Sequence, residues 1–391
     1  MPMNRRAVII LSLATLLLHA WPMWRWLSTL NQEPVTFTIY SPSIPVDNDP
    51  PHMAEEFISY DPGPGMVHVA SICEMADGRL VAIWYGGSRE GARDTVIYFA
   101  RRAPGEAMSW SKPRVVVNRE SASKELHRFV KKIGNSIIFV DSEDRLWLIY
   151  VTMTVGGWSG SSLNVKISRD GGKTWTTSQR LTLSPFLNVS ELVRNRPLPM
   201  RGGGFFIPIY HECLGKFPEI LWIRAGETDQ RITFRKTRMA GGRSFIQPSV
   251  VGYDSRVATA FYRSSSDERA VGMAITSDTG ATWSEPQNLG LPNPDSSLSA
   301  LLLSEGRTLL AFNDSKQTRE NLRLAISYDG GANWMRVAEI ENNPGDEFSY
   351  PYMIRSLDGR IHLVYTWRRK RIKYVVFNEN WINAQIKKAS K

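Results

Sequence analysis

A few carboxylates, arginines and tyrosines are the residues of this sequence most suited to chemistry. Glu212 and Arg263 each follow a run of mostly apolar residues, and Tyr350 lies in an aromatic-rich stretch. Carboxyl groups transfer protons, arginines bind carboxylates through paired charge-assisted hydrogen bonds, and a tyrosine that loses its proton becomes a nucleophile. Such groups suit acid–base or nucleophilic work on an anionic molecule, provided that the fold brings them together.

Metal and cofactor chemistry has no comparable support in the sequence. The 6 histidines are dispersed, with neither a His-x-x-His nor a Cys-x-x-Cys spacing. No glycine-rich phosphate loop and no Ser-His-Asp arrangement stands out. We therefore expect neither a metal nor a cofactor.

A turn followed by an apolar run recurs six times, at intervals of 51 to 66 residues. Each copy has the pattern of a tight turn and a buried strand, and the interval is typical of the blades of a β-propeller. The copies begin at Asp77, Glu143, Gly202, Tyr253, Glu305 and Asp358. The sequence thus predicts an all-β chain with six blades.

A second, independent repeat has the pattern S/T-x-D-x-G-x-x-W. Its copies are Ser168–Trp175, Thr276–Trp283 and Ser327–Trp334, and Ser109-Trp110-Ser111 is a remnant of another. The Asp can bind its own backbone and the Gly can take a positive φ, which together make a turn that the Trp fixes. We expect these aspartates to be structural.

The two repeats together resemble those of the sialidase superfamily, whose Asp boxes lie on the outer rim of a six-bladed propeller. The resemblance covers residues 60–377 and implies hydrolysis of a terminal acidic sugar, either sialic acid or a related 2-keto-3-deoxy sugar acid, on a glycan or surface glycolipid.

The resemblance also assigns roles to particular positions. Asp94, five residues after Arg89, matches the general acid/base, and Arg89 itself would bind substrate or orient that acid. Tyr350, eight residues before the last Asp-Gly turn, matches the nucleophile. Arg263 and Arg319 match two of the three arginines that hold the sugar carboxylate, and we call these two the clamp arginines. A neutral phenol suits this reaction because a carboxylate nucleophile would be repelled by the substrate.

Several positions depart from the family pattern. His68 stands where the first arginine is expected, and Thr366 replaces the glutamate that steadies that arginine. Gln247 occupies the place of the glutamate that serves the nucleophile, and an amide cannot act as a base. Glu212 is our candidate for the missing base.

Alternative interpretations remain open. Asp94 could pin a hairpin, His68 could be a satisfied core histidine, and the two clamp arginines could form ion pairs on the rim. At the level of function, the alternatives are a propeller that binds glycans without turning them over and a polysaccharide lyase that uses Tyr350 and His68.

The net charge of +10 favours an anionic partner. Apart from Arg368–Arg371 and Lys387-Lys388, the basic residues are scattered, and no nucleic-acid-binding motif accompanies them. We expect a glycan partner and no nucleic acid.

The ends of the chain divide as follows. Residues 1–30 carry Arg5 and Arg6 before an apolar run, which predicts a signal peptide or signal anchor and hence export, to the periplasm or the inner membrane of a bacterium. Residues 31–60 are proline-rich, and we interpret them as a linker or extended entry strand. We interpret residues 61–380 as the propeller and residues 381–391 as a basic tail.

Cys73 and Cys213 could pair, but we favour two buried thiols.

Overall fold

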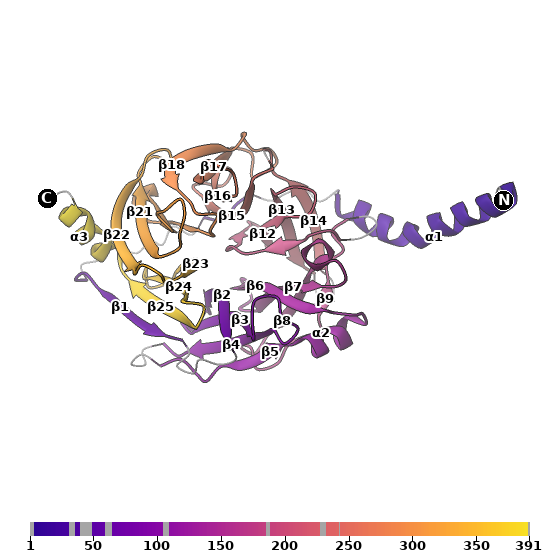
Figure 1. Ribbon diagram of the computed structural model, residues 1–391, viewed down its shortest axis with the longest axis horizontal. Helices are drawn as coiled ribbons and strands as arrows, with labels where there is room; N and C mark the ends of the chain where they lie inside the picture. Colours follow the sequence, from indigo (N-terminus) through magenta and orange to yellow (C-terminus); the bar gives the residue numbers. More distant parts are fainter. Residues whose placement is uncertain are drawn as a thin grey trace.

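Six small antiparallel sheets are arranged around a central axis (Figure 1). The computed structural model describes residues 4–30, 36–39, 49–58, 65–104, 109–184, 188–226, 232–241 and 243–389. The six-bladed all-β prediction is confirmed. In each of blades 1, 2, 4, 5 and 6 the strand next to the axis comes first in the chain, and the strands that follow lie progressively farther out.

The strand bounds follow the blade order. Blade 1 consists of β2 (Met66–Glu74), β3 (Leu80–Gly87), β4 (Val96–Arg102) and β5 (Arg114–Val117). Blade 2 consists of β6 (Lys132–Val140), β7 (Leu146–Met153), β8 (Ser161–Ser168) and β9 (Gln179–Arg180). Blade 3 consists of β10 (Leu192–Val193), β11 (Leu198–Pro199), β12 (Phe205–His211), β13 (Phe217–Ala225) and β14 (Ile232–Arg238).

The second half of the ring repeats this plan. Blade 4 consists of β15 (Phe245–Gly252), β16 (Ala258–Ser264), β17 (Ala270–Thr276) and β18 (Gln287–Pro292). Blade 5 consists of β19 (Ser299–Leu302), β20 (Thr308–Phe312), β21 (Asn321–Ser327) and β22 (Met335–Asn342). Blade 6 consists of β23 (Phe348–Arg355), β24 (Ile361–Trp367), β25 (Arg371–Phe377) and β1 (Met53–Phe57).

The ring is closed by a strand from the other end of the chain. β1 pairs antiparallel with β25, with Glu55 opposite Val375. This contact ties residues 53–57, which lie in the segment expected to be a linker or entry strand, into the last blade. Closure of this kind leaves no blade without its outer strand, so fewer backbone groups lack partners.

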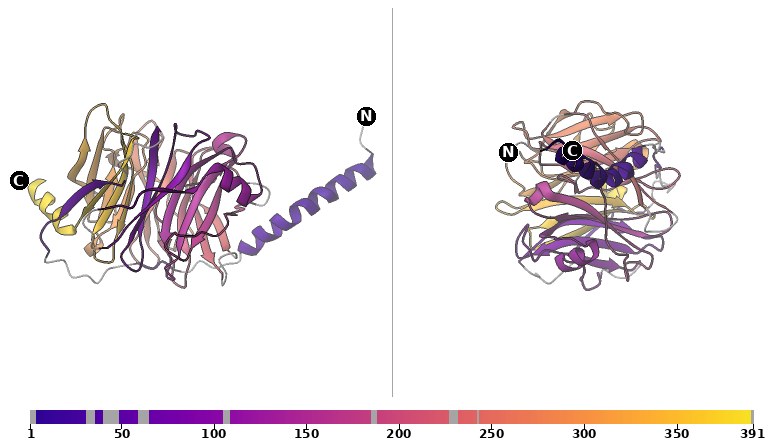
Figure 2. Two further views of the ribbon diagram at one scale, coloured as in Figure 1. Left: turned by 90° about the horizontal axis from the view of Figure 1, so that it is seen from below. Right: turned by 90° about the vertical axis from the view of Figure 1, so that its right-hand side faces the viewer.

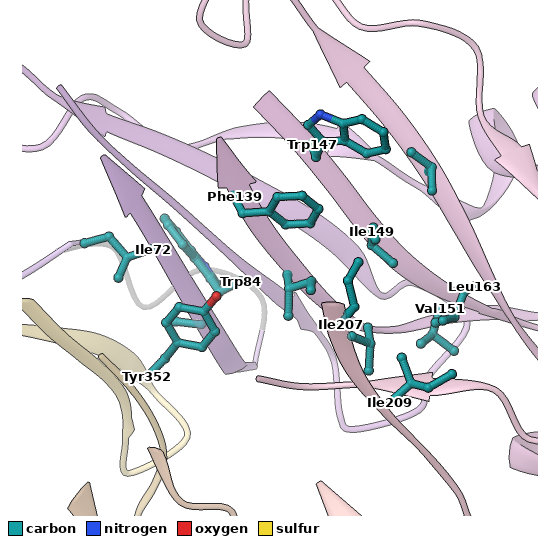
Figure 3. Close-up of a cluster of buried hydrophobic side chains, with 14 of the residues drawn as sticks. Ile72, Trp84, Phe139, Trp147, Ile149, Val151, Leu163, Ile207, Ile209 and Tyr352 are labelled. Atoms are coloured by element: carbon teal, nitrogen blue, oxygen red, sulfur yellow. The ribbon is translucent and has the colours of Figure 1, made fainter. Parts of the chain in front are cut away.

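The core fills the spaces between neighbouring blades. Its largest cluster joins side chains of blades 1, 2, 3 and 6, and Figure 3 shows Trp84, Phe139, Ile207 and Tyr352 within it. Continuous apolar runs such as β7, which is buried along its whole length, supply these contacts on both faces.

Three helices in the described residues lie outside the blades. α1 (Arg5–Leu30) extends away from the ring (Figure 2), and apolar side chains along it, such as Leu16, Leu17 and Leu18, are exposed. No helix in the described part of the chain is long and apolar enough to span a membrane. α2 (Arg119–Leu126) follows blade 1, and two short 3-10 turns cover Gly157–Gly160 and Ser304–Gly306.

Two expectations from the sequence differ from the structure. Residues 379–389 form helix α3 (Glu379–Ala389), whose Ile382 is buried against blades 5 and 6, so this part of the chain is not simply a basic tail. Both cysteines are free, but only Cys73 is buried. Cys213 is exposed because it lies just beyond the end of β12, and the expectation of two buried thiols was wrong for it.

Candidate functional site

The inner strands of four blades carry a bulge at the same position, near their first residues. In β2, β6, β15 and β23 two residues stand opposite one residue of the next strand. The first bulge residue has a positive φ in three of them: Val69 (54°), Gln247 (54°) and Tyr350 (56°). Bulges change the direction of side chains, and non-glycine residues with positive φ persist only where the surroundings hold them. The bulges therefore mark one end of the central axis as the candidate site. We call this end, which carries the bulges at Val69, Gln247 and Tyr350, the mouth.

Two buried side chains from blade 3 hold the bulges of β2, β15 and β23 in place. Arg194 donates through Nη2 to the carbonyl oxygen of Tyr350 at 2.6 Å and to that of the next residue at 3.0 Å, and through Nη1 to that of Ala70 at 3.2 Å. Asn195 donates in the same way to the carbonyl oxygens of Gln247 and its successor, at 2.8 and 3.0 Å. Burial lowers the pKa of Arg194 to about 10, so it is cationic at neutral pH.

Tyr350 lies among arginines. Arg263 donates from Nη1 to the Tyr350 hydroxyl at 3.2 Å and from Nε to Asp295 Oδ1 at 2.6 Å. Arg319 lies with its guanidinium carbon 5.8 Å from the Tyr350 ring centroid and donates to the Asp295 carbonyl oxygen at 2.8 Å. Burial alone would lower the pKa of Arg263, but Tyr350 and Asp295 raise it above its usual range. The two predicted clamp arginines are thus beside the predicted nucleophile.

His68 contacts the same tyrosine. Its ring centroid lies 4.5 Å from that of Tyr350, and its Nδ1 shares a 2.9 Å hydrogen bond with Thr366 Oγ1, which also accepts from the Val69 backbone N–H. Burial, and then the charges of nearby arginines, hold the pKa of His68 well below its usual range, so the ring is neutral. The family's arginine and glutamate are here replaced by a neutral pair that is also in contact.

Gln247 is engaged at both ends of its amide. Its Oε1 accepts from Arg263 at 3.4 Å, and its Nε2 donates to the Tyr210 hydroxyl at 3.1 Å. Asn135 donates to the same hydroxyl at 3.0 Å. Gln247 therefore orients Arg263 and has no role open to it as a base.

Glu212 lies next to this group, immediately after β12. Its backbone N–H donates to Ser190 Oγ at 2.9 Å. Burial raises the pKa of its carboxyl group, while the charges of Arg263 and Lys216 act in the opposite direction and that of Asp295 adds to the rise. A half-buried carboxyl group near Arg263 suits the part of a base, although no hydrogen bond joins it to Tyr350 among the described residues.

The predicted acid lies in a loop of blade 1. Asp94 is exposed in the loop from β3 to β4, where its carboxylate accepts from the Ser88 backbone N–H and from the Ser88 hydroxyl, both at 3.0 Å. Arg89 is exposed in the same loop. Glu90 connects the loop to blade 6 through an ion pair of 2.6 Å with Arg369. The structure thus places Asp94 and Arg89 in a loop that an ion pair connects to blade 6, and among the described residues no hydrogen bond joins either of them to Tyr350.

Several residues of this site carry no signal that identifies them in the sequence. Arg194 and Asp295 come from irregular segments, where no repeat points to them. Arg369 belongs to the basic run Arg368–Arg371, but a run of basic residues does not by itself indicate where in a propeller it lies. In the described part of the chain, no group of three or more His, Cys, Asp or Glu side chains is arranged to hold a metal ion.

The chain is similar to a known family of repeat domains. The model of the BNR repeat-like domain matches residues 78–363. A sialidase of Bacteroides fragilis (strain YCH46) is 24% identical over 257 residues, which are 56% of this chain and 44% of that protein. The chain therefore matches less than half the length of this curated relative.

Solved sialidase structures share the fold. A Hadza microbial sialidase superposes with a TM-score of 0.65 at 16% identity, over 82% of this chain and 68% of that one. Trypanosoma rangeli sialidase in complex with sialic acid gives a TM-score of 0.61 at 13% identity, over 83% of this chain and 56% of that one. At these identities the likeness shows the fold. Since the family model covers most of the chain, this protein belongs to the BNR repeat-like domain family and is a divergent, sialidase-like member of it.

Proposed function

We propose that this protein is a retaining exo-glycosidase that removes a terminal acidic sugar, sialic acid or a related 2-keto-3-deoxy sugar acid, from a glycan or surface glycolipid. The observation that carries the proposal is the contact between Arg263 and the Tyr350 hydroxyl, with Arg319 beside the same ring. A cationic donor on a buried phenol stabilises the phenolate, and two neighbouring guanidinium groups suit a carboxylate. Sialidase relatives in sequence and structure support the same reaction class.

In this mechanism Arg263 and Arg319 hold the sugar carboxylate. The phenol of Tyr350 passes its proton to Glu212, and its oxygen attacks the anomeric carbon as Asp94 protonates the departing glycosidic oxygen. Water, deprotonated by Asp94, then attacks from the same face that the leaving group occupied, and the departing phenol oxygen regains its proton from Glu212. Two inversions give net retention.

The test is hydrolysis of aryl glycosides of sugar acids by the full chain and by two tyrosine variants. Tyr350→Phe removes the nucleophile, and we expect kcat to fall by at least about a thousandfold. Tyr352→Phe is the matched control, because Tyr352 lies on the same strand and its buried hydroxyl makes no hydrogen bond among the described residues. Unchanged turnover in Tyr350→Phe would exclude this mechanism.

Asp94→Asn examines the proposed acid separately. We expect a large loss for substrates with a poor leaving group and a small loss for those whose aryl group leaves without protonation. Equal losses for both kinds of substrate would show that Asp94 acts through the loop structure instead.

A second candidate is a polysaccharide lyase, favoured by the contact between His68 and Tyr350. In such an enzyme the tyrosine removes a proton from the sugar acid and the neighbouring ring assists. Product analysis separates the candidates, because a lyase forms an unsaturated, ultraviolet-absorbing sugar and a hydrolase forms a reducing sugar. Binding without either product would indicate a glycan-binding propeller.

Export is part of the proposal. It is supported by Arg5 and Arg6 ahead of the apolar residues of α1. Cell fractionation followed by mass measurement distinguishes a cleaved signal from a retained anchor. Recovery of the intact chain from the cytoplasm would contradict export.

A further inference from the structure

The turn between β24 and β25 has an unusual backbone for its residues. Arg368 and Arg369 both have a φ of 54°, and the Lys370 backbone N–H donates to the Trp367 carbonyl oxygen at 3.0 Å. Two successive residues with positive φ are typical of a type I′ hairpin turn, which favours Asn and Gly. Arginines are disfavoured there on steric grounds, and such strain persists where surrounding contacts hold it.

Contacts from blades 1 and 6 hold this turn at the mouth. The Arg368 backbone N–H donates to the Glu347 carbonyl oxygen at 2.6 Å, and the Arg369 carbonyl oxygen accepts from the Val67 N–H at 2.9 Å. The Arg369 side chain donates from Nε to Glu347 Oε2 at 2.7 Å and from Nη1 to Glu90 Oε2 at 2.6 Å. The guanidinium is therefore fixed between the start of β23 and the loop that carries Asp94.

Glu347 connects Arg369 to Arg319, one of the two clamp arginines. Glu347 lies between two arginines, since its other oxygen, Oε1, is 3.4 Å from Arg319 Nη1. Burial alone would raise the pKa of Glu347, but its hydrogen bonds to Arg369 and Ser349 and the charges of the two arginines bring the pKa below its usual range. Glu347 is thus ionised and links Arg369 to Arg319.

The same guanidinium acts on His68, the residue that stands in place of the family's first arginine. Among the charged groups that lower the pKa of His68, Arg369 has the largest effect, ahead of Arg319, Arg194 and Arg263. His68 is neutral and fully buried, so it supplies no charge to an incoming anion. The backbone of Arg369 is nevertheless hydrogen-bonded to Val67, the neighbour of His68 in the chain, so the turn that carries this cation lies against the strand of His68.

The geometry points to Arg369 as the third cationic member of the anion clamp, supplied by the β24–β25 turn in place of the arginine that His68 has displaced. This inference rests on the proposed function and deepens it. The side chain is 34% exposed, and its Nη2 takes part in neither ion pair. It binds the carboxylate of the sugar acid together with Arg263 and Arg319, while Glu347 and Glu90 hold it in position.

The experiment measures binding rather than turnover. Calorimetric titration of the full chain uses sialic acid and 3-deoxy-manno-octulosonic acid, each compared with its methyl ester, which lacks the charge. We expect Arg369→Gln to weaken binding of the preferred acid by about ten- to a hundredfold and that of its ester by less than about threefold, since a charge-assisted pair is lost. Lys370→Gln is the control, because it removes the same charge from an exposed side chain of the same turn.

Two further variants separate binding from a structural role. Arg369→Lys keeps the charge, so it should recover part of the acid affinity. Glu90→Gln breaks one of the two ion pairs that position Arg369 and leaves the one with Glu347, so acid binding should weaken by clearly less than in Arg369→Gln. If Glu90→Gln weakens acid binding as much as Arg369→Gln, Arg369 serves only to connect blade 6 to blade 1. The inference is also overturned if Arg369→Gln affects acid and ester equally, or if the wild-type chain does not prefer either acid to its ester.

The outcome is distinguishable from that of the proposed function. A chain that binds the acid through Arg369 without hydrolysing its glycosides would contradict the glycosidase and leave the clamp intact. A chain that hydrolyses acidic substrates equally well with Gln at position 369 would contradict the clamp alone.

Discussion

The Asp-box turns on the outer strands and the mouth of the axis are built in opposite ways. In all three boxes the first hydroxyl accepts from the backbone N–H of a glycine at 2.9 Å, and the Asp accepts from a backbone N–H four residues later, also at 2.9 Å. Every bond in this set joins residues four apart. The boxes are therefore local structures that repeat because each one satisfies its own backbone.

The boxes also seal each blade to the one before it. Gly172, Gly280 and Gly331 lie against phenylalanine rings of the preceding blades, so closely that an added Cβ would be 2.5 to 2.6 Å from the ring. The Trp of each box packs near the same ring, and Trp110 of blade 1 lies similarly against Tyr374 of blade 6. The most recognisable motif thus supplies scaffold.

The bulges repeat at the mouth, but the side-chain bonds there do not. The bond from Arg263 to Tyr350 spans 87 residues of sequence, that from Arg194 to Tyr350 spans 156, and that between His68 and Thr366 spans 298. Each bond joins two different strands or segments and occurs once. Candidate catalytic residues are therefore to be sought where side-chain contacts differ from blade to blade and join distant parts of the chain.

Removal of a mouth arginine should give the largest effect on activity. We expect Arg263→Met to lower kcat/KM by about a thousandfold, or about 4 kcal/mol, because both the phenol and the substrate carboxylate lose a charged donor. Arg323→Met is the rim control, since Arg323 also forms ion pairs, in its case with Asp314 and Glu339. Steady-state kinetics on folded protein should show no change for the control, and similar losses in both variants would break the comparison.

A rim glycine should affect stability and spare activity. Gly331→Ala places a Cβ 2.6 Å from the Phe261 ring at a φ of +104°, and we expect a loss of about 3 kcal/mol in the free energy of unfolding. Gly330→Ala has a φ of +73° but nothing within 4 Å, so it should lose only about 1 kcal/mol. Denaturant unfolding gives both values. A fall in kcat of the folded Gly331→Ala protein would contradict the separation of rim and mouth.

The proposed base should control the acidic limb of the pH–rate profile. Burial raises the pKa of Glu212, and a base works when ionised, so kcat/KM should rise with pH through a value above the usual range for a carboxyl group. Glu212→Gln should lower kcat by about ten- to a hundredfold and remove this limb. A limb that persists in the variant would assign it to another group.

The smallest effect is expected in acid. The backbone hydrogen bond from Asn333, with other bonds in the box, lowers the pKa of Asp329 to about 2. Its contribution to stability is therefore present above the unfolded value, about 3.9, and is lost as the pH falls toward 2. Asp329→Asn should flatten this dependence and shift the acid-unfolding midpoint by about a few tenths of a pH unit. An identical dependence would show that the box carboxylate is not linked to stability.

Much of the fold could be predicted from the sequence because its signals are local. The turn-and-strand repeat gave six blades, and the Asp-box turns lie where the pattern indicated. Helix α3 was missed because Lys387 and Lys388 suggested a solvated tail, although Trp381 and Ile382 pack against the neighbouring strands. Short helices attached to a propeller have no repeat to reveal them.

The site could be predicted only in part. Tyr350 was placed by its distance from a repeated turn, Arg263 by its position at the end of a repeated strand, and His68 by its position at the opening of blade 1. Arg194 could not be identified in this way, because its partners are backbone carbonyl oxygens in other blades. Arg369 was equally hidden, since its place depends on the positive φ of a turn that the sequence would not favour.

The central claim is that the mouth acts through Tyr350 as a nucleophile. The most direct measurement incubates the full chain with an activated, fluorinated sugar acid that slows the second step, and then locates the adduct by peptide mass spectrometry. If Tyr350 is the nucleophile, the sugar is bound to the peptide that contains Tyr350, and no adduct forms in Tyr350→Phe. An adduct on another residue, or turnover of an acidic aryl glycoside with no adduct at all, would contradict it.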